Sequence, residues 1–405
     1  MVPPSTDTVS AMRTEIDSSS AAQVQERLAL LRDSAFRYAD RGAHVKRARA
    51  LRATQPGHDI SVWRELADLG WLGVLIPEEF GGLGLGCAEM AVIGEVLGSA
   101  LLPEPVTAAV VFAGGCIVHG ENEGLKSELL PLIASGTMVP AVAWREDGHD
   151  CDYLNVSTRA ERTKNGVRLF GKKKLVIAGA TADGLVLSAR GTEGMSLYWA
   201  SRSQLGAVVY QMLPDGRAMA EVTLDGIELP TGQCIAGARV AEAALARAFD
   251  EALIITSAEL LGISSALLDT TLEYLRTRVQ FGRPIGSFQA LQHRAVDLYI
   301  QLRTCRHTLE DVCDRLGKPE VTASERGAQA SRLKARCAIA SLHIAKEAVQ
   351  MHGAMGYSDE CDVGLYLKRA VTLSAWLGGA DVHRRRYAKL ALTREALAAN
   401  SRGDR

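Results

Sequence analysis

The feature that most constrains the fold is a change of periodicity along the chain, from helical to alternating and back to helical. From about residue 21 to 136, apolar residues such as Leu28 and Leu31 recur at helical spacing. From about 137 to 235, short alternating runs are separated by turn signals such as Asn165-Gly166, which predicts antiparallel strands. Long amphipathic patterns return from about 236 to 396. We therefore expect an α+β protein with three parts: an N-terminal helical domain (21–136), a middle antiparallel β-domain (137–235) and a C-terminal four-helix bundle (236–396).

The two ends of the chain lack this patterning. Residues 1–20 are rich in Ser and Thr and lack the apolar core of a signal peptide, so we expect a flexible tail there and a second tail over 397–405. No stretch reaches the roughly 20 uninterrupted apolar residues of a membrane span. The eight cysteines are widely spaced, without the Cys/His spacing of a metal site. These patterns predict a cytoplasmic protein with no metal and no membrane span.

The charge of the chain narrows the class of partner. The 405 residues include 46 Lys and Arg against 47 Asp and Glu, for a formal net charge of −1. Nucleic acid and anionic membrane surfaces attract proteins with a basic excess. We therefore expect no nucleic-acid partner.

Two segments of the last domain carry a recognisable pattern. Residues 278–293 read RVQFGRPIGSFQALQH, and residues 350–357 read QMHGAMGY. They are similar to the motifs RxxFGxxIxxFQxxQ and QxxGGxGY of the acyl-CoA dehydrogenase superfamily, and residues 77–84, PEEFGGLG, resemble the family's N-terminal motif. The three segments occur in the family's order. The resemblance implies that family's fold, FAD as cofactor, an acyl-CoA substrate and an electron-transferring flavoprotein as acceptor.

The resemblance also implies which residues contact the cofactor. In that family the arginine of the first motif reaches across a subunit interface to the pyrophosphate of FAD, where a guanidinium fork matches two phosphate oxygens. The residues carried over by position are Arg278, Phe281, Phe288 and Gln289 for the phosphate and adenosine part, and Gln350, Gly353 and Gly356 for the adenine end. All of them would act on the FAD of a neighbouring subunit.

The catalytic base of the family does not carry over. An ungapped alignment from the second motif places Leu377 where most members have a glutamate, and leucine cannot accept a proton. Some members carry the base on the helix that opens the last domain, and that position falls on Ala252. Glu251 is adjacent and Glu259 lies two turns later, so Glu251 is the first candidate for a displaced base and Glu259 the second. Leu253 replaces an arginine that many members place near CoA.

In the β-domain, too, residues that the family uses for its flavin are replaced. Members that hold flavin there have a hydroxyl-rich loop and a Trp-Ile-Thr or Trp-Ile-Ser strand. Here the loop 144–152 keeps an acid at Glu146 and offers Trp144 for stacking, but Leu175 and Ile177 supply neither the aromatic ring nor the hydroxyl.

The residues that would be lent to a neighbour are thus present, whereas those for the chain's own flavin and substrate are replaced. Our leading hypothesis is that this chain is the base-lacking subunit of a heteromeric FAD-dependent acyl-CoA dehydrogenase. Such heteromeric enzymes act on bulky substrates such as steroid side-chain thioesters. A second acyl-CoA dehydrogenase-like subunit would then be its partner. Two alternatives stay open: a homo-oligomeric dehydrogenase with Glu251 as a displaced base, and a non-catalytic scaffold of the same fold.

Overall fold

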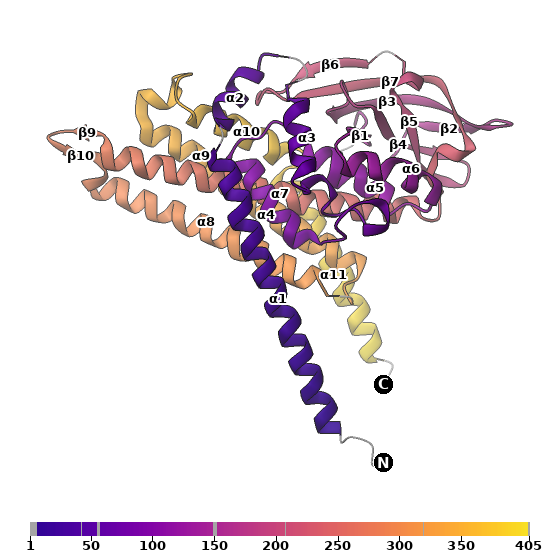
Figure 1. The fold of residues 1–405 in the computed structure, drawn as a ribbon, viewed down its shortest axis with the longest axis horizontal. Coiled ribbons are helices and arrows are strands. Elements are labelled where there is room, and N and C mark those ends of the chain that lie inside the picture. The colour runs from indigo at the N-terminus through magenta and orange to yellow at the C-terminus, as the bar shows by residue number, and fades with distance from the viewer. Residues whose placement is uncertain are drawn as a thin grey trace.

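The N-terminal part of the chain is helical (Figure 1). The computed structural model describes residues 6–41, 43–54, 57–148, 152–206, 208–318 and 320–403. The helices of this part are α1 (Thr6–Arg41), α2 (His44–Leu51), α3 (Ile60–Asp68), α4 (Cys87–Ser99), α5 (Gly115–Val118) and α6 (Glu123–Ala134). A π-helical segment, η3 (Thr107–Gly114), leads directly into α5.

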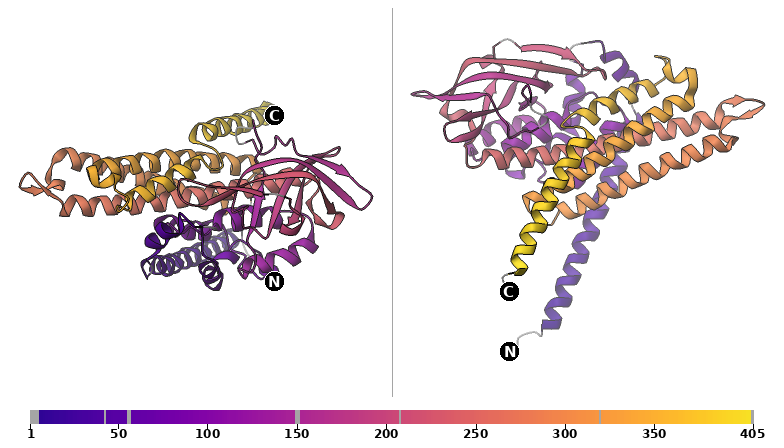
Figure 2. Two further views of the ribbon diagram at one scale, coloured as in Figure 1. Left: turned by 90° about the horizontal axis from the view of Figure 1, so that it is seen from above. Right: turned by 180° about the vertical axis from the view of Figure 1, so that it is seen from behind.

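The ends of the chain differ from the predicted tails. Helix α1 begins at Thr6 and α11 extends to Gly403, whereas residues 1–5 and 404–405 lie outside the described part. The prediction gave weight to the Ser and Thr content, but residues 6–41 contain no Gly or Pro that would interrupt a helix. Figures 1 and 2 show that the first half of α1 and the last part of α11 project from the same side of the molecule.

The middle part is an eight-stranded, mostly antiparallel sheet. Its strands are β1 (Pro140–Ala143), β2 (Arg159–Arg162), β3 (Gly166–Ile177), β4 (Gly184–Gly191), β5 (Gly194–Ser201), β6 (Val208–Met212), β7 (Ala218–Pro230) and β8 (Cys234–Ala236). The strand order is β6-β7-β3-β2-β4-β5-β8, and β1 pairs with β4 in parallel. Asn165-Gly166 lies at the β2–β3 hairpin as predicted, with Arg162 opposite Val167. One apolar core fills the interior of this domain, and the other face of the sheet joins the core of the helical domains.

The C-terminal part is a long helical bundle. Its helices are α7 (Ala241–Thr277), α8 (Gln289–Leu316), α9 (Ala323–His352), α10 (Val363–Ala375) and α11 (Ala380–Gly403). The view from above in Figure 2 shows the bundle running from the β-domain to a hairpin at the far end, β9 (Val279–Gln280) and β10 (Arg283–Pro284). By length and composition α7 is apolar enough to cross a membrane, but 83% of its most apolar window is buried inside the fold. It is the central helix of the bundle.

Glycines set the contact between the two helical domains. A Cβ at Gly98 of α4 would lie 2.0 Å from the carbonyl oxygen of Glu259 on α7. A Cβ at Gly262 of α7 would lie equally close to the carbonyl oxygen of Glu95 on α4. The missing side chains let the two backbones approach to a distance that any other residue would prevent. This crossing fixes α4 and the start of η3 against α7.

Candidate functional site

The first motif segment forms the exposed end of the bundle. Helix α7 ends at Thr277, and Arg278 follows in an extended conformation with φ −74° and ψ 119°. The β9–β10 hairpin then leads to Gln289, the first residue of α8. Arg278 and Gln289 are both exposed. The structure therefore places both predicted cofactor residues on the surface, at the end of the molecule away from the β-domain.

The turn of the hairpin carries an aromatic residue in an unusual conformation. Phe281 has φ +53° and Gly282 has φ +78°, as in two-residue turns that favour Asn-Gly. Phe281 is 90% exposed, and its ring centroid lies 6.2 Å from that of Phe288. A left-handed backbone costs a non-glycine residue on the order of 1 kcal/mol. An exposed ring gains little in return within this chain, so Phe281 is a candidate contact for a second molecule.

The second motif segment lies at the same end of the bundle. The ring of His352, the last residue of α9, stacks on Tyr274 of α7 with centroids 4.3 Å apart. Gln350 is exposed, and Gly353 has φ 60° and ψ −137°, a conformation that glycine adopts and other residues avoid. A Cβ at Gly353 would project into open space, whereas a Cβ at Gly356 would lie 2.5 Å from a carbonyl oxygen of α9. Gly356 is thus required for packing, and Gly353 leaves bare backbone that a ligand can approach.

The turn that holds the family's base position is closed and carries an apolar side chain. Leu377, between α10 and α11, is completely buried and has φ +60°. The Lys334 ammonium donates to the carbonyl oxygens of Ser374 and Gly378, each at 3.1 Å. The Nε2 atom of His383 lies 3.1 Å from the Leu377 carbonyl oxygen. Burial lowers the pKa of His383 to about 3, so this ring is neutral at pH 7 and donates from Nε2. The turn is held rigidly around a side chain that cannot take a proton.

The two β-domain segments singled out by the sequence lie side by side. The backbone N–H of Lys174 donates to the carbonyl oxygen of Arg145 at 2.9 Å. Leu175 has φ +53°, and Ile177 is buried. Residues 149–151 of the loop lie outside the described residues. Neither apolar side chain offers a hydrogen bond to a ligand at this position.

Aromatic rings fill the space between β1 and α7. Trp144 is buried, with its ring centroid 5.6 Å from that of Phe249 on α7 and 6.3 Å from that of Phe112 on η3. The Tyr153 ring lies 4.6 Å from Phe249. We call Phe112, Trp144, Tyr153 and Phe249 the aromatic cluster. Trp144 is covered by this cluster and is not presented to a ligand.

An ion pair closes the aromatic cluster on the side of α11. Arg386 donates to Asp250 at 2.6 Å and to the Tyr153 hydroxyl at 3.2 Å. Its guanidinium carbon lies 5.6 Å from the Phe249 ring centroid, within the range of a cation–π contact. Arg326 lies 3.5 Å from the other oxygen of Asp250. Burial raises the pKa of Asp250 although two arginines oppose the shift. The cluster is thus fixed by a buried carboxylate and two partly buried arginines.

Glu146 belongs to the interior of the β-domain. Its carboxylate accepts hydrogen bonds from the backbone N–H of Ser157 and Thr158 at 2.6 and 3.0 Å. The Lys173 ammonium lies 2.6 Å from Glu146 and donates to Ser188 at 2.9 Å. Burial alone would raise the pKa of Glu146, but Lys173 and these hydrogen bonds outweigh it and lower that pKa. Burial lowers the pKa of Lys173 to about 8, so both groups are charged at pH 7. The acid of the family's loop is used here as a structural ion pair.

Glu251 faces away from the aromatic cluster. It follows Phe249 by two residues, a rotation of about 200° on an α-helix. One Glu251 oxygen lies 2.9 Å from Nε2 of His119, and the other accepts from Arg247 at 3.2 Å. Burial would raise the pKa of Glu251, but His119 and Arg247 outweigh it and lower that pKa. Glu251 lines a cleft of about 1760 Å³ between the two helical domains. The first candidate base thus lies on the side of α7 opposite the β-domain.

Glu259 and Leu253 lie within the core. Glu259 is 4% exposed and accepts a hydrogen bond from the Thr107 hydroxyl. Burial raises the pKa of Glu259, although Arg217 and Arg369 oppose the shift. Leu253 is completely buried. Within the described ranges, no group of three or more His, Cys, Asp or Glu side chains is placed to hold a metal ion.

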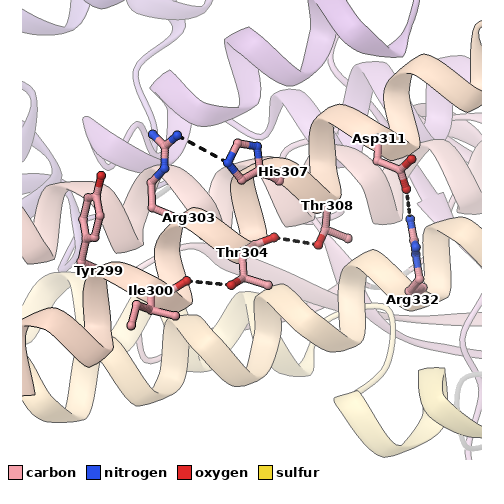
Figure 3. Close-up of a pocket in the computed structure, with 8 residues that line it drawn as sticks. All are labelled: Tyr299, Ile300, Arg303, Thr304, His307, Thr308, Asp311 and Arg332. Atoms are coloured by element: carbon pink, nitrogen blue, oxygen red, sulfur yellow. Dashed lines mark hydrogen bonds and ion pairs between the residues drawn. The ribbon is translucent and has the colours of Figure 1, made fainter.

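A shallow groove of about 450 Å³ runs along the outer surface of α8 and α9 (Figure 3). Thr304 and Thr308 donate back to carbonyl oxygens of α8 at 2.7 Å, and Asp311 is paired with Arg332. Tyr299 and Ile300 are each 53% exposed beside it. Most of its polar side chains are thus engaged with one another or with the α8 backbone, and the groove does not hold a set of converging polar groups.

Comparisons with known proteins agree on one family. Residues 25–137 match the family described as "Acyl-CoA dehydrogenase, N-terminal domain", and residues 237–392 match "Acyl-CoA dehydrogenase, C-terminal domain". The chain is 30% identical to acyl-CoA dehydrogenase IpdE2 of Mycolicibacterium smegmatis over 357 residues, which are 88% of this chain and 96% of the relative. It is 26% identical to mitochondrial isovaleryl-CoA dehydrogenase of Solanum tuberosum over 80% of this chain and 81% of the relative.

Similar solved structures agree with these family matches. A variant of the "Tcur3481-Tcur3483 steroid ACAD" has a TM-score of 0.82 and 28% identity, covering 92% of this chain and 99% of that chain. The ChsE4-ChsE5 complex of Mycobacterium tuberculosis has a TM-score of 0.80 and 27% identity, covering 89% and 96%. The fold is therefore that of the acyl-CoA dehydrogenases. The chain belongs to the acyl-CoA dehydrogenase family.

FAD, the cofactor of this family, fits one of the two sites and not the other. At the end of the bundle, an exposed arginine, Arg278, and the open backbone at Gly353 suit a phosphate and a planar ring. Between β1 and α7, the aromatic cluster occupies the space, and Leu175 and Ile177 offer no hydrogen bond. The end of the bundle thus has groups that suit part of an FAD molecule, whereas the residues between β1 and α7 do not fit an isoalloxazine ring.

Proposed function

We propose that this chain is the subunit of a heteromeric FAD-dependent acyl-CoA dehydrogenase that lacks the usual base and completes the FAD site of its partner. The observation that carries the proposal is the contrast between the two ends of the bundle. Arg278, Gln289 and Gln350 are exposed around the open backbone of Gly353, whereas Leu377 is buried in a fixed apolar turn. The chain thus offers a surface to a cofactor, but its side chain at the family's usual base position, Leu377, cannot accept a proton.

The exposed apolar residues support an assembly with a second chain. Phe281 is 90% exposed and Tyr357 is 85% exposed at the end of the bundle. Val296, Tyr299 and Ile300 are each at least half exposed along α8. Large exposed apolar side chains grouped on one surface are typical of interfaces. The steroid acyl-CoA dehydrogenase and the ChsE4-ChsE5 complex, two similar structures, are named as pairs, and we propose a second acyl-CoA dehydrogenase-like subunit here.

The reaction follows from the family. When bound, FAD accepts the hydride in the α,β-desaturation of an acyl-CoA thioester. In our proposal the Arg278 guanidinium binds the pyrophosphate of the partner's cofactor, and the hairpin around Phe281 shields it from water. The partner provides the base. We propose a bulky substrate such as a steroid side-chain thioester, an electron-transferring flavoprotein as acceptor, and a cytoplasmic location.

The test is a pair of arginine substitutions in the co-expressed complex. Arg278→Ala removes a charge-assisted contact that typically contributes about 1.5–3 kcal/mol, so FAD affinity should fall by about 10- to 100-fold. Arg276→Ala is the matched control, because Arg276 is also exposed and lies 3.7 Å from Glu273 of its own chain. We expect the Arg278 variant to release FAD on gel filtration and to lose acyl-CoA oxidation, while the Arg276 variant keeps both. Equal FAD retention by the two variants would refute the proposal.

The placement of Glu251 favours keeping a second candidate function. Glu251 lines a large cleft and is hydrogen-bonded to His119, an arrangement suited to proton transfer. A homo-oligomeric dehydrogenase with Glu251 as base predicts that the chain alone holds FAD and oxidises an acyl-CoA, and that Glu251→Gln abolishes turnover without releasing flavin. A chain that remains free of flavin with every partner would instead indicate a scaffold.

A further inference from the structure

A large cleft in the described part of the chain lies between the two helical domains. Its volume is about 1760 Å³, above the range of about 300–1,000 Å³ typical of small-molecule sites. Its walls come from α1, α4, α7, α8 and the loop before α4, with smaller contributions from η3, α5 and α9. The aromatic cluster and Leu377 are absent from its lining. The cleft is therefore separate from the aromatic cluster and from the usual base position at Leu377, although it includes Glu251, the candidate for a displaced base.

Apolar side chains from four elements form much of the lining. Leu28 belongs to α1, Val92 to α4, Ile254 to α7, and Leu309 and Leu316 to α8. Small residues widen the cleft at the start of α4, where Ala88 is only partly buried. Burial of apolar ligand surface against such walls gives about 25 cal/mol per Å². The lining favours an apolar ligand.

The charges of the lining are balanced. It contains six cationic and six carboxylate side chains. The cationic ones are Arg27, Arg32, Arg247, Arg306, Lys318 and Arg326. Each is paired with a carboxylate of the same chain. A nucleotide or CoA brings several negative charges and needs cations that are not already neutralised. The cleft therefore disfavours a polyanionic ligand.

One hydrogen-bonded polar pair lies where α5 and α7 border the cleft. The Glu251 carboxylate and the His119 ring are 2.9 Å apart, with side chains that are 12% and 16% exposed. Both line the cleft beside Gly115, where a Cβ would lie 3.6 Å from the Glu251 oxygen. A ligand hydroxyl can donate a hydrogen bond to the Glu251 carboxylate, which has further acceptor positions beside those used by His119 and Arg247.

From these features we propose that the cleft between α1, α4 and α8 binds a neutral, mainly apolar molecule with a hydroxyl group at the Glu251–His119 end. The site does not depend on the proposed function, because none of its residues lies in the FAD-contacting surface. Helix α1 forms one wall, and Arg27 and Arg32 fasten it to the buried Glu89 and Glu95 of α4.

The test uses Nile red, a neutral apolar dye whose fluorescence rises on transfer from water, with the full-length chain alone and in the co-expressed complex. We expect saturable binding that Ala88→Trp weakens by about tenfold or more, because the indole occupies the cleft. Val209→Trp, at an exposed position of β6, is the control and should bind like the unmodified chain. Leu316→Asp, on the opposite wall, should also weaken binding, which keeps the test valid if Ala88→Trp misfolds.

Three outcomes would overturn the proposal. One is equal binding by a folded Ala88→Trp variant. Another is displacement of the dye by CoA, which would indicate a polyanion site. The third is dye binding by the free chain that disappears in the complex, which would indicate that a segment of the partner fills the cleft.

Discussion

Replacing Phe249 by alanine tests whether the aromatic cluster is a permanent part of the core. Phe249 is 1% exposed and contacts three rings at centroid distances of 4.6, 5.6 and 5.9 Å. The Arg386 guanidinium carbon lies over the Phe249 ring, 5.6 Å from the ring centroid. Buried Phe→Ala substitutions cost about 3–5 kcal/mol, and the ring and cation contacts place Phe249→Ala near the middle, at about 4 kcal/mol.

Phe281→Ala is the matched control for this substitution. It removes the same side chain from a position that is 90% exposed, so the free energy of unfolding of the free chain should change by no more than about 0.5 kcal/mol. Urea unfolding of the purified chain, followed by circular dichroism, measures both variants. In the complex we expect the reverse order, with Phe281→Ala weakening assembly more than Phe249→Ala does.

The stability of the free chain with added FAD gives the result that would refute a closed aromatic cluster. If the rings moved aside for a flavin, FAD at about 100 times its Kd would stabilise the free chain by about 2.7 kcal/mol. We expect no such stabilisation of the chain alone, and a loss below about 1 kcal/mol for Phe249→Ala would equally contradict a closed cluster.

Three further substitutions have definite expected outcomes. Leu377→Glu restores a carboxylate at the family's base position, but the aromatic cluster remains, so we expect no acyl-CoA oxidation by the chain alone and a stability loss of about 3 kcal/mol from the buried acid; turnover in a flavin-reduction assay would contradict this. The pKa of His383 is about 3 in the folded chain and near 6.5 when unfolded, so the unfolded state takes up the extra proton and the chain should lose stability as pH falls below about 6.5. His383→Gln should flatten that loss in urea midpoints measured between about pH 7 and pH 4.5. Lys173→Met leaves the buried Glu146 without its cation and should cost about 3–5 kcal/mol; adding Glu146→Gln should recover much of this in thermal unfolding, and purely additive losses would show that the pair is not coupled.

The fold could be predicted from periodicity because each domain has its own spacing of apolar residues. Within the segment 137–235, short apolar or alternating runs occur at 139–144, 167–170, 185–189, 197–199, 208–210 and 220–224, and each overlaps an observed strand. Two strands escaped the pattern. Strand β2 is largely exposed and polar, with the sequence RAER, and β8 has only three residues. The parallel pairing of β1 with β4 joins segments that are 44 residues apart in sequence, and local patterns do not encode such a pairing.

The sequence allowed only the motif residues of the candidate site to be predicted. Motif spacing identified Arg278 and Gly353, because both lie in short continuous segments, but their roles remain predictions. The aromatic cluster could not be predicted, because Phe112, Tyr153 and Phe249 are distant in sequence and meet only through the packing of η3 and α7. The composition gave one indication. Only 5% of the residues are aromatic, so the four rings of the cluster are a considerable share of the aromatic residues.

The most direct test of the central claim is the FAD content and native mass of the chain, expressed alone and with the product of an adjacent dehydrogenase-like gene. Our account predicts a flavin-free chain when expressed alone. It predicts about one FAD per two chains on co-expression, in a particle with two copies of each subunit. One FAD per chain in a homo-oligomer would contradict the account and direct attention to Glu251.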